Sequence, residues 1–231
     1  MKKTIGIIVS LLICLIMLTG CVNINYEVKV NKDGSGDISY VYAFSKETLE
    51  SLKVSVDEMI ASSKEQAEKN GYKTESYEDK ENLGFKATKH IGSLETEFSL
   101  QDAFGDEYVK DNENNSIKVK KDLFKTEITQ NAEIDLTSMS EIATLVKMKY
   151  TVKLPVSIKS NNATKVDGQS LTWELKGGEV NKIEYTAVGI NVMTILGIVL
   201  VVAAVIAIVV VGYIFMKKNK KEKVVKEETN K

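Results

Sequence analysis

The chain has 231 residues, of which 43% are hydrophobic and 27% are charged, so it has the length of one medium domain or two small ones. All 31 cationic residues are lysine, and without arginine the chain lacks the forked guanidinium that recognises phosphates and base edges bidentately. Nucleic acid is therefore not an expected partner. The formal net charge of −1 combines an acidic part, residues 22–189 with 22 Lys against 29 Asp and Glu, and a basic part, residues 217–231 with 7 Lys against 3 Glu.

The N-terminus has the pattern of a bacterial lipoprotein signal. Lys2 and Lys3 precede an apolar run, residues 5–17, which is too short for a spanning helix of about 20 residues. The run ends in Leu-Thr-Gly-Cys at Cys21, which resembles a lipobox. This resemblance implies removal of residues 1–20 and lipidation of Cys21, with a diacylglyceryl group on the thiol and acyl chains such as palmitate. The alternatives are an uncleaved signal anchor and a secretory signal with a chance cysteine.

A second apolar segment, residues 192–216, contains no charge and covers about 37 Å as an α-helix at 1.5 Å per residue. That length crosses a hydrocarbon core of about 30 Å with some tilt. Lysines follow the segment directly, whereas the stretch before it is slightly acidic, so the positive-inside rule places the C-terminus in the cytoplasm. We expect an extracytoplasmic domain over residues 21–189, a single transmembrane helix over residues 190–216 and a basic cytoplasmic tail over residues 217–231.

The expected domain has almost no slack at either end. Alternation predicts a strand over residues 22–30, directly after Cys21 and without a Ser/Gly-rich spacer. A second strand is predicted over residues 182–188, about four residues before the apolar helix. We therefore expect the domain to lie against the outer face of the cell membrane, both lipid-anchored and single-pass, with a ligand or partner close to the bilayer.

A turn that reads Asn-Lys-Asp-Gly-Ser-Gly begins at Asn31, between two alternating runs, and predicts a β-hairpin. A calcium loop is the alternative, because oxygen-bearing side chains recur at every second position from Asn31 to Asp37. Tyr42 stands where such a loop needs its bidentate Glu. The pattern therefore favours a plain turn.

One main helix is expected over residues 56–70, because Ser55 and Glu58 have the spacing of a capping box and Gly71 suits a left-handed cap. Shorter helices are expected from Ser45 and over residues 93–100. The residues expected on the inward face of the main helix are Val56, Met59, Ile60, Ser63 and Ala67. We interpret that face as core packing, with the lining of a lipid pocket as the alternative.

Alternating runs predict most of the remaining strands, so the expected fold class is α+β with a mostly antiparallel sheet, one main helix, a short second helix and the C-terminal transmembrane helix. The predicted strands cover residues 72–78, 84–90, 116–124, 133–137, 144–153, 156–160, 170–175 and 182–188. Lys118 and Lys120 share one strand face, which is either solvated or in contact with lipid headgroups.

Few residues suggest chemistry. His90, the only histidine, has no evident Cys partner or second ligand, so we interpret it as a strand residue rather than a general base. Trp173, the only tryptophan, is interpreted as a core residue, with a ligand platform as the alternative. The carboxylates that could serve a hydrolase are Asp33, Asp37, Asp79 and Asp111, but no pattern places two of them together. We expect no catalytic, metal or cofactor residue, which leaves Cys21 as the one site residue.

The order of these features resembles the LppM family of bacterial lipoproteins, over essentially the whole chain. The resemblance is carried by the lipobox cysteine leading into a strand, the Asn-Lys-Asp-Gly-Ser-Gly turn, Gly71-Tyr72-Lys73, Tyr77-Glu78-Asp79, Gly84-Phe85-Lys86, Ser93-Leu94 and the segment from Pro155 to Trp173. It implies an α+β extracytoplasmic domain that handles envelope lipids or glycolipids, and it supplies no catalytic residue.

We therefore expect a non-enzymatic surface lipoprotein whose partners are the lipid bilayer and a lipid or amphiphile bound at the outer face of the membrane. The alternative is an accessory subunit that docks on a membrane protein partner. A carboxylate hydrolase is the third possibility.

Overall fold

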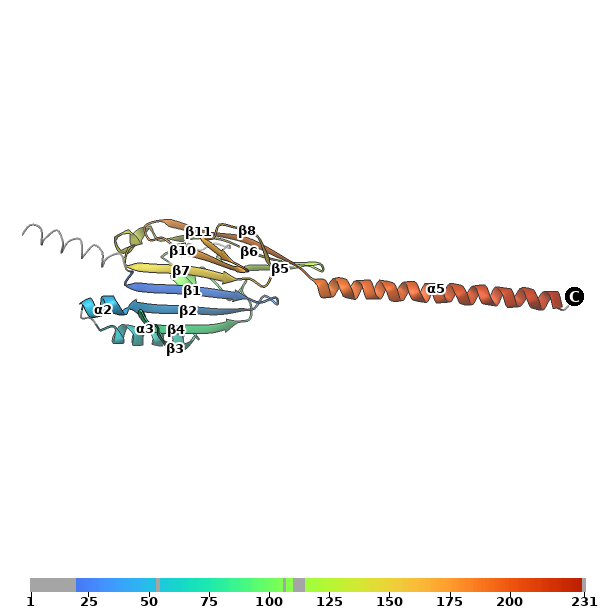
Figure 1. Ribbon diagram of the computed structural model, residues 1–231, viewed down its shortest axis with the longest axis horizontal. Coiled ribbons are helices and arrows are strands. Elements are labelled where there is room, and N and C mark those ends of the chain that lie inside the picture. The colour runs from blue at the N-terminus through green and yellow to red at the C-terminus, as the bar shows by residue number, and fades with distance from the viewer. Residues whose placement is uncertain (1–19, 53–54, 106, 110–114, 230–231) are drawn as a thin grey trace, which may run out of the picture. The chain divides into compact units, whose positions relative to one another are not determined.

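The computed structural model describes residues 20–229, apart from residues 53–54, 106 and 110–114 (Figure 1). The expected signal peptide, except Gly20, and the candidate carboxylate Asp111 lie outside the described residues. The chain divides into two compact units, residues 1–121 with 126–189 and residues 122–125 with 190–231. The first unit contains the expected α+β domain.

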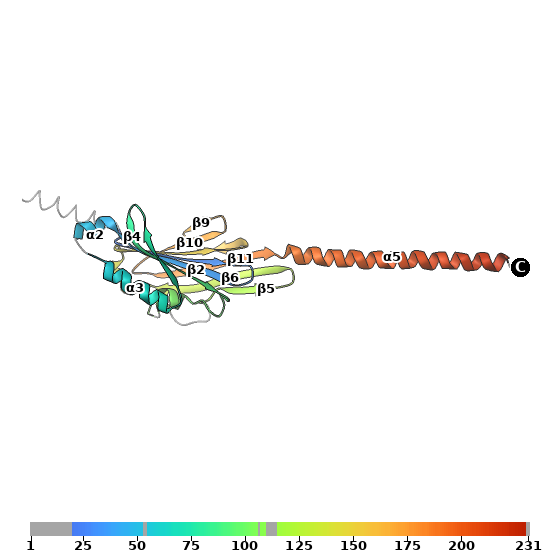
Figure 2. The same ribbon diagram turned by 90° about the horizontal axis from the view of Figure 1, so that it is seen from below.

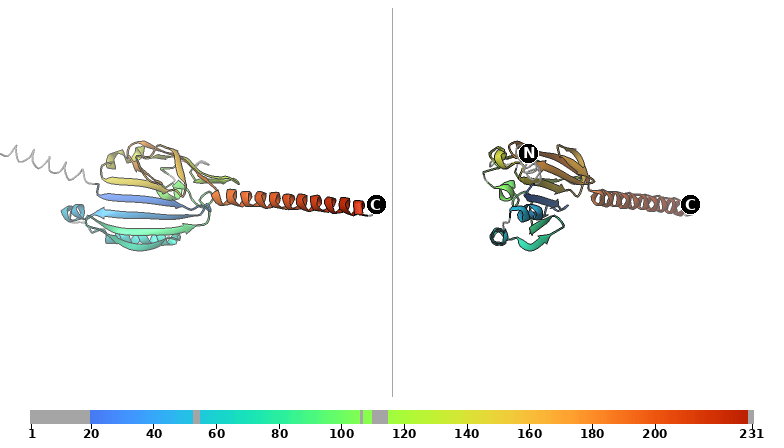
Figure 3. Two further views of the ribbon diagram at one scale, coloured as in Figure 1. Left: turned by 45° about the vertical axis from the view of Figure 1, so that its right-hand side comes forward. Right: turned by 60° about the vertical axis from the view of Figure 1, so that its left-hand side comes forward.

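The first unit is built around a seven-stranded sheet with the order β3-β4-β2-β1-β7-β10-β9. Its strands are β1 (Val22–Val30), β2 (Gly36–Ser45), β3 (Lys73–Glu78), β4 (Asn82–Ile91), β7 (Val146–Lys153), β9 (Lys165–Asp167) and β10 (Ser170–Leu175). Five of the six neighbouring pairs are antiparallel, and β1 with β7 is parallel. The first strand of the domain therefore lies in the middle of this sheet, between β2 and the yellow β7 (Figure 3, left).

A second sheet of four strands has the order β5-β6-β11-β8. Its strands are β5 (Lys118–Lys121), β6 (Lys125–Asp135), β8 (Ser157–Asn161) and β11 (Val180–Ile190). Buried side chains of β6 and β11 share one hydrophobic core with those of β1, β7 and β10. We call the face of the large sheet that carries this core the inner face and the opposite one the outer face. The sequence predicted a mostly antiparallel sheet, and the structure divides these strands between two sheets.

The domain contains short helices α2 (Lys46–Leu52), α4 (Leu100–Phe104) and the 3₁₀ helix η1 (Thr137–Ile142), and the longer α3 (Asp57–Lys69). Helix α3 packs on β3 and β4 (Figure 2). The predicted main helix and the helix after Ser45 are confirmed, and Gly71 has the expected positive φ of 81°.

The predicted capping box is wrong. The N-cap residue is Val56, whose side chain makes no cap hydrogen bond, and the Ser55 hydroxyl donates to the carboxylate of Asp57 at 2.9 Å and accepts from the Asp57 N–H at 3.4 Å. Met59 is 52% exposed rather than inward, because the helix packs on the sheet mainly through its second half, where Ala67 is buried.

Two further elements differ from expectation. The predicted helix over residues 93–100 is a turn, and α4 begins only at Leu100, where the Ser99 hydroxyl accepts a hydrogen bond from the Gln101 N–H at 3.1 Å. The strand predicted over residues 133–137 begins at Lys125. The part of β6 before residue 133 does not show an alternation of apolar and polar residues, because the polar residues Thr126 and Gln130 occupy buried positions there.

Four aromatic rings form a ladder on the inner face. Tyr40, Tyr26, Tyr150 and Trp173 occupy paired positions on the adjacent strands β2, β1, β7 and β10. Neighbouring ring centroids are separated by 6.0, 6.2 and 5.8 Å. Trp173 is 4% exposed and its indole N–H donates to Asn162 Oδ1 at 2.7 Å, which confirms its interpretation as a core residue.

Tyr150 in this ladder and Tyr185 beside it are both buried, but they differ in one hydrogen bond. The Tyr150 hydroxyl donates to Gln130 Oε1 at 3.0 Å, whereas the Tyr185 hydroxyl has no partner among the described residues. We expect Tyr150→Phe to destabilise the domain by about 1–3 kcal/mol, because it leaves a buried acceptor unpaired, and Tyr185→Phe to be neutral or stabilising. The measurement is thermal unfolding of the full chain in nanodiscs, followed by near-ultraviolet circular dichroism. Tyr150→Phe should lower the midpoint temperature of unfolding by about 2–4 °C per kcal/mol, and Tyr185→Phe should not lower it. Equal losses in both variants would contradict this assignment.

The β3–β4 turn is stabilised by one carboxylate. Asp79 accepts hydrogen bonds from the Tyr77 hydroxyl at 2.6 Å and from the N–H groups of Glu81 and Asn82 at 2.8 and 2.7 Å. These bonds, that of Tyr77 first, lower the pKa of Asp79 from 3.8 to about 2.

Because the pKa of Asp79 is lower in the folded chain, its contribution to stability is full above about pH 4 and is lost as the pH falls towards 2. A carboxyl titration by NMR is expected to give a midpoint near 2 for Asp79. In the Asp79→Asn variant, the unfolding temperature should decrease less between about pH 4 and pH 2 than it does in the unchanged chain. Glu81→Gln, on the same turn, should not have this effect. An NMR titration midpoint for Asp79 near the ordinary aspartate pKa of 3.8 would contradict this prediction.

The two ends of the first unit lie at opposite ends of β7. Beside its start, the Cys21 carbonyl accepts from Ser45 N–H at 2.9 Å and Val22 N–H donates to the Leu145 carbonyl at 3.0 Å. Beyond its end, Val188 of β11 pairs with Ser157 of β8. The 8 residues of β7 span about 26 Å at about 3.3 Å per residue. Both ends enter sheets with no spacer, as the sequence predicts.

The second unit contains helix α5 (Val192–Thr229) and the hairpin tip at residues 122–125. Residues Val192–Ile214 have a mean hydropathy of 3.3, and none of the most apolar stretch is buried. By length and composition this helix can cross a membrane. Its backbone continues as helix to Thr229, beyond the predicted end of the apolar segment.

A tyrosine-lined cavity as the candidate functional site

The residues that the sequence singled out for chemistry are spread over the first unit. His90 is a strand residue, as the sequence predicts. It lies on the outer face of β4, and its Nδ1 is 2.7 Å from Asp37 Oδ1 on β2. Asp33 lies in the β1–β2 turn, and Asp79 lies in the β3–β4 turn at the other end of β2. The described carboxylates therefore do not share one cleft, and Asp111 lies outside the described residues.

The oxygen-rich turn closes on itself. The Asp33 carboxylate accepts from the hydroxyl and the N–H of Ser35 at 2.6 and 3.0 Å, and Asn31 Nδ2 donates to the same hydroxyl at 3.0 Å. The bonds from Ser35 lower the pKa of Asp33. Within residues 20–229, leaving out 53–54, 106 and 110–114, no group of three or more His, Cys, Asp or Glu is placed to hold a metal.

A cavity of about 320 Å³ opens on the inner face, between β1, β2 and β4 on one side and the segments that follow α3 and precede α4 on the other. Its apolar wall consists of Tyr26, Ile38, Ile91 and Phe98. All four side chains are at most 4% exposed, so this wall is part of the core and is rigidly placed. The volume lies at the low end for small-molecule sites.

Two tyrosine hydroxyls meet in this cavity. Tyr26 Oη lies 3.5 Å from Tyr72 Oη, at the limit of a hydrogen bond. Burial raises the pKa of Tyr26 well above its ordinary value of 10.0, with Tyr72 as the second cause, and burial also raises the pKa of Tyr72. Both hydroxyls are therefore neutral at physiological pH and can donate as well as accept hydrogen bonds.

The rim of the cavity carries more negative than positive charge. Lys89 Nζ lies 5.4 Å from the centroid of the Tyr72 ring and donates to the Asn70 carbonyl at 3.0 Å. Glu97 and Asp102 contribute two exposed carboxylates. An anionic headgroup is disfavoured beside this pair, whereas a hydroxyl-rich or cationic headgroup is suited to it.

The outer face of the large sheet carries a second, more open hollow of about 610 Å³. Its lining includes Glu27, Asp37, Lys73 and His90. Ion pairs cross this face, including Lys153 with Glu27 at 2.8 Å. Because Glu27 pairs with Lys153, and Asp37 with Lys29 and His90, on an open and solvated face, this hollow is less suited to enclose a ligand than the tyrosine-lined cavity is.

Sequence reasoning did not find the cavity. It placed a lipid pocket, as an alternative, along the Met and Ile stripe of the main helix, but the structure places Asn70 and Tyr72, which follow α3, at the cavity instead. The sequence feature that could have indicated the cavity is the set of tyrosines on inner-face positions of β1 and β2, namely Tyr26, Tyr40 and Tyr42.

The comparisons with known proteins bear on the first unit. The LppM domain model matches residues 23–188 of this chain. The NMR structure of the folded domain of the Mycobacterium tuberculosis LppM protein is similar with 15% sequence identity and a TM-score of 0.49, over 76% of this chain and 94% of that chain. Among curated proteins, none matches this chain.

Proposed function

Because the chain belongs to the LppM family, we propose that it is a surface lipoprotein, held at the outer face of the plasma membrane by acyl chains on Cys21 and by the helix Val192–Ile214. The lipobox-like residues before Cys21 and the lysines that follow the apolar helix support this topology. The domain between the anchors binds an amphiphile and does not catalyse a reaction.

The positions of the two attachment points support a domain that lies along the bilayer. Cys21 and Val188 flank opposite ends of β7, about 26 Å apart at about 3.3 Å per residue. If the domain stood upright on the helix, Cys21 would be held at that height above the bilayer, out of reach of the hydrocarbon core that its acyl chains must enter. With both anchors inserted, β7 therefore runs roughly parallel to the membrane surface.

The tyrosine-lined cavity is the observation that carries the proposed binding function. Two neutral hydroxyls converge in it, next to the buried apolar side chains of its wall. This combination matches an amphiphile with a hydroxyl-rich or amine-bearing headgroup, because the polar end pairs with the tyrosines and the apolar part covers Ile91 and Phe98. The carboxylates of the rim select against phosphate-only headgroups.

Photo-crosslinking tests this function directly. The full chain in nanodiscs is exposed to diazirine-bearing lipids with glycosyl, amine or phosphate headgroups, and the crosslinked peptides are mapped by mass spectrometry. We expect crosslinks to the cavity from the first two classes. Tyr72→Phe, which removes one converging hydroxyl, should reduce them about fivefold, equivalent to a lost hydrogen bond of about 1 kcal/mol.

Tyr42→Phe is the matched control, because Tyr42 is half-buried on the same sheet and does not line the cavity. Equal crosslinking in Tyr72→Phe and the unchanged chain, or crosslinks spread evenly over the domain, would remove the support for a binding site here.

An accessory subunit of a membrane complex is the second candidate role, favoured by the outer face of the large sheet, which no described element covers. Cross-strand ion pairs such as Lys149 with Glu174 at 3.5 Å leave a polar, complementary surface of the kind found in transient interfaces. Lysine-directed crosslinking in native membranes should then recover a stoichiometric protein partner at Lys149, and only lipid adducts would favour the first role.

A further inference from the structure

The loop between β5 and β6 has an unexpected composition. The two residues at its tip, Leu123 and Phe124, are 60% and 56% exposed, and a hydrogen bond from Asp122 N–H to the Lys125 carbonyl at 2.8 Å closes the hairpin around them. Two-residue hairpin loops favour Gly, Asn and Asp, whose backbones tolerate the tight turn and whose polarity suits water. Two large apolar side chains in such a loop are poorly matched to an aqueous environment.

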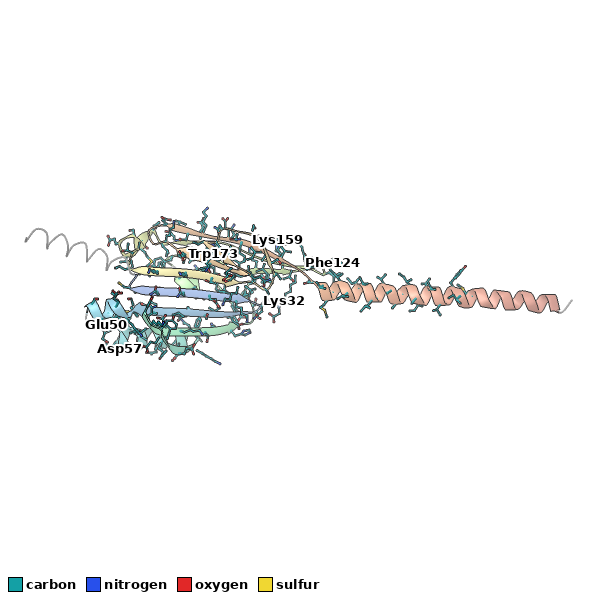
Figure 4. The ribbon with its side chains drawn as sticks, in the orientation of Figure 1. Lys32, Glu50, Asp57, Phe124, Lys159 and Trp173 are labelled. Atoms are coloured by element: carbon teal, nitrogen blue, oxygen red, sulfur yellow. The ribbon has the colours of Figure 1, made fainter. Side chains whose placement is uncertain are left out.

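Asn191 ties this loop to the entry of the apolar helix. Its N–H donates to the Phe124 carbonyl at 2.9 Å and its Nδ2 donates to the Asp122 carbonyl at 2.8 Å. Its own carbonyl accepts from Ile195 N–H at 3.2 Å, so Asn191 also begins the helical hydrogen bonding of α5. Figure 4 shows Phe124 beside the first turn of that helix. The loop is therefore fixed at the level of Val192, the first residue of the apolar span.

We propose that Leu123 and Phe124 insert into the outer leaflet beside the helix and form a further contact of the protein with lipid. This inference rests on the proposed function, because it requires that residues 192–214 span the membrane. A side chain fixed at the first residue of the span lies at the interface between headgroups and hydrocarbon, where exposed Leu and Phe are stabilised by burial among acyl chains.

The charges that flank the loop agree with a lipid occupant. Lys120, Lys121 and Lys125 are exposed and lie within three residues of the apolar pair. The Lys121 ammonium donates to the Asp33 carbonyl at 2.5 Å. Long lysine side chains at this depth, such as Lys120, extend their ammonium groups to the headgroup region and attract anionic lipids, while their methylene stems cover apolar surface. Leu123 and Phe124 lie next to the apolar helix and are flanked by lysines. Both features favour contact with the lipid bilayer over insertion into a groove of another protein.

Depth-dependent quenching tests the proposal on the full chain. Phe124→Cys is labelled with an environment-sensitive fluorophore and reconstituted into phosphatidylcholine and phosphatidylglycerol vesicles with a nitroxide near the top of the acyl chains. Two controls accompany it: Val205→Cys at the middle of the helix, and Val166→Cys on β9, which is 50% exposed and thus matches Phe124. Leu123→Cys provides an independent second probe, and the unchanged chain reports background labelling of Cys21.

We expect the emission at positions 123 and 124 to fall by about half or more and to shift to the blue, while position 166 stays unquenched. Quenching at 205 without quenching at 123 or 124 would overturn this inference and leave the proposed span intact. Absence of quenching at 205 as well would overturn the membrane anchor and this inference together. Equal quenching at 124 and 166 would show a general adsorption of the domain to lipid, and would also overturn a specific role for the loop.

Discussion

Replacing Gly84 with alanine is expected to destabilise the α+β domain by about 3 kcal/mol or more, a large effect for the addition of a single methyl group. Gly84 lies in β4 and pairs with Ala43 of β2 on one side and with Tyr77 of β3 on the other. A Cβ at this position would clash with the Tyr42 carbonyl oxygen and lie 2.7 Å from the Ala43 Cα. Both atoms belong to the backbone of an interior strand, so neither can rotate away as a side chain would.

The measurement is again the unfolding midpoint of the full chain in nanodiscs, which should fall by about 6–12 °C for a loss of about 3 kcal/mol. Gly168→Ala serves as the matched control. Gly168 has a φ of 59°, but a Cβ added there would have no atom of the described residues within 4 Å beyond Gly168 and its two chain neighbours, so its replacement costs only local backbone strain of about 1 kcal/mol. A midpoint for Gly84→Ala within about 2 °C of that of the unchanged chain would show that β2 and β4 do not approach each other this closely.

Local sequence signals predicted the parts of the fold that local chemistry controls. The Asp33-Gly34 turn joins two alternating runs, and the structure forms the β1–β2 hairpin there with nine paired positions. The strands around Asp79 likewise form the β3–β4 hairpin. The C-terminal end of α3 is followed by Gly71, whose positive φ the sequence predicts. In the two hairpins the turn residues fix the register of the paired strands, and at Gly71 the absence of a side chain allows the positive φ that ends the helix.

The candidate site could not be predicted in this way, because its residues are brought together by non-local pairing. Tyr26 and Tyr72 are separated by 46 positions and meet only after β2 and β4 have assembled beside β1. The parallel pairing that places Tyr150 next to Tyr26 joins strands with more than 100 residues between them. Single-sequence alternation identifies which residues face inward, but it does not specify which strand is next to which.

The β5–β6 loop shows how a functional feature can mislead sequence reasoning. The apolar pair Leu123 and Phe124 extended the predicted strand to residue 124, because apolar residues are rare in two-residue hairpin loops. The structure ends β5 at Lys121 and starts β6 at Lys125. A local rule fails here at the position where the proposed lipid contact supplies a reason for the exception.

Removal of one anchor is expected to leave the protein in the membrane fraction, and removal of both is expected to release it completely. Cys21→Ser removes the thiol that receives the lipid, but the 23 residues of Val192–Ile214 retain the chain without help. A chain that ends at Gly189 loses the helix but keeps two or more acyl chains, which also suffice for stable anchoring. Only the chain that carries Cys21→Ser and also ends at Gly189 should appear in the medium.

Metabolic labelling with palmitate separates the two anchors in the same cells. Label is expected to be lost entirely in Cys21→Ser and to be retained in the chain that ends at Gly189. Because each single change leaves one sufficient anchor, a graded release by either one would contradict the proposed topology, as would label that persists without the Cys21 thiol. A tag after Lys231 should be protected from external protease in intact cells, since the lysines that follow the apolar helix favour the cytoplasmic side. Digestion of that tag with the domain protected would reverse the orientation, and both the cavity and the β5–β6 loop would then face the cytoplasm.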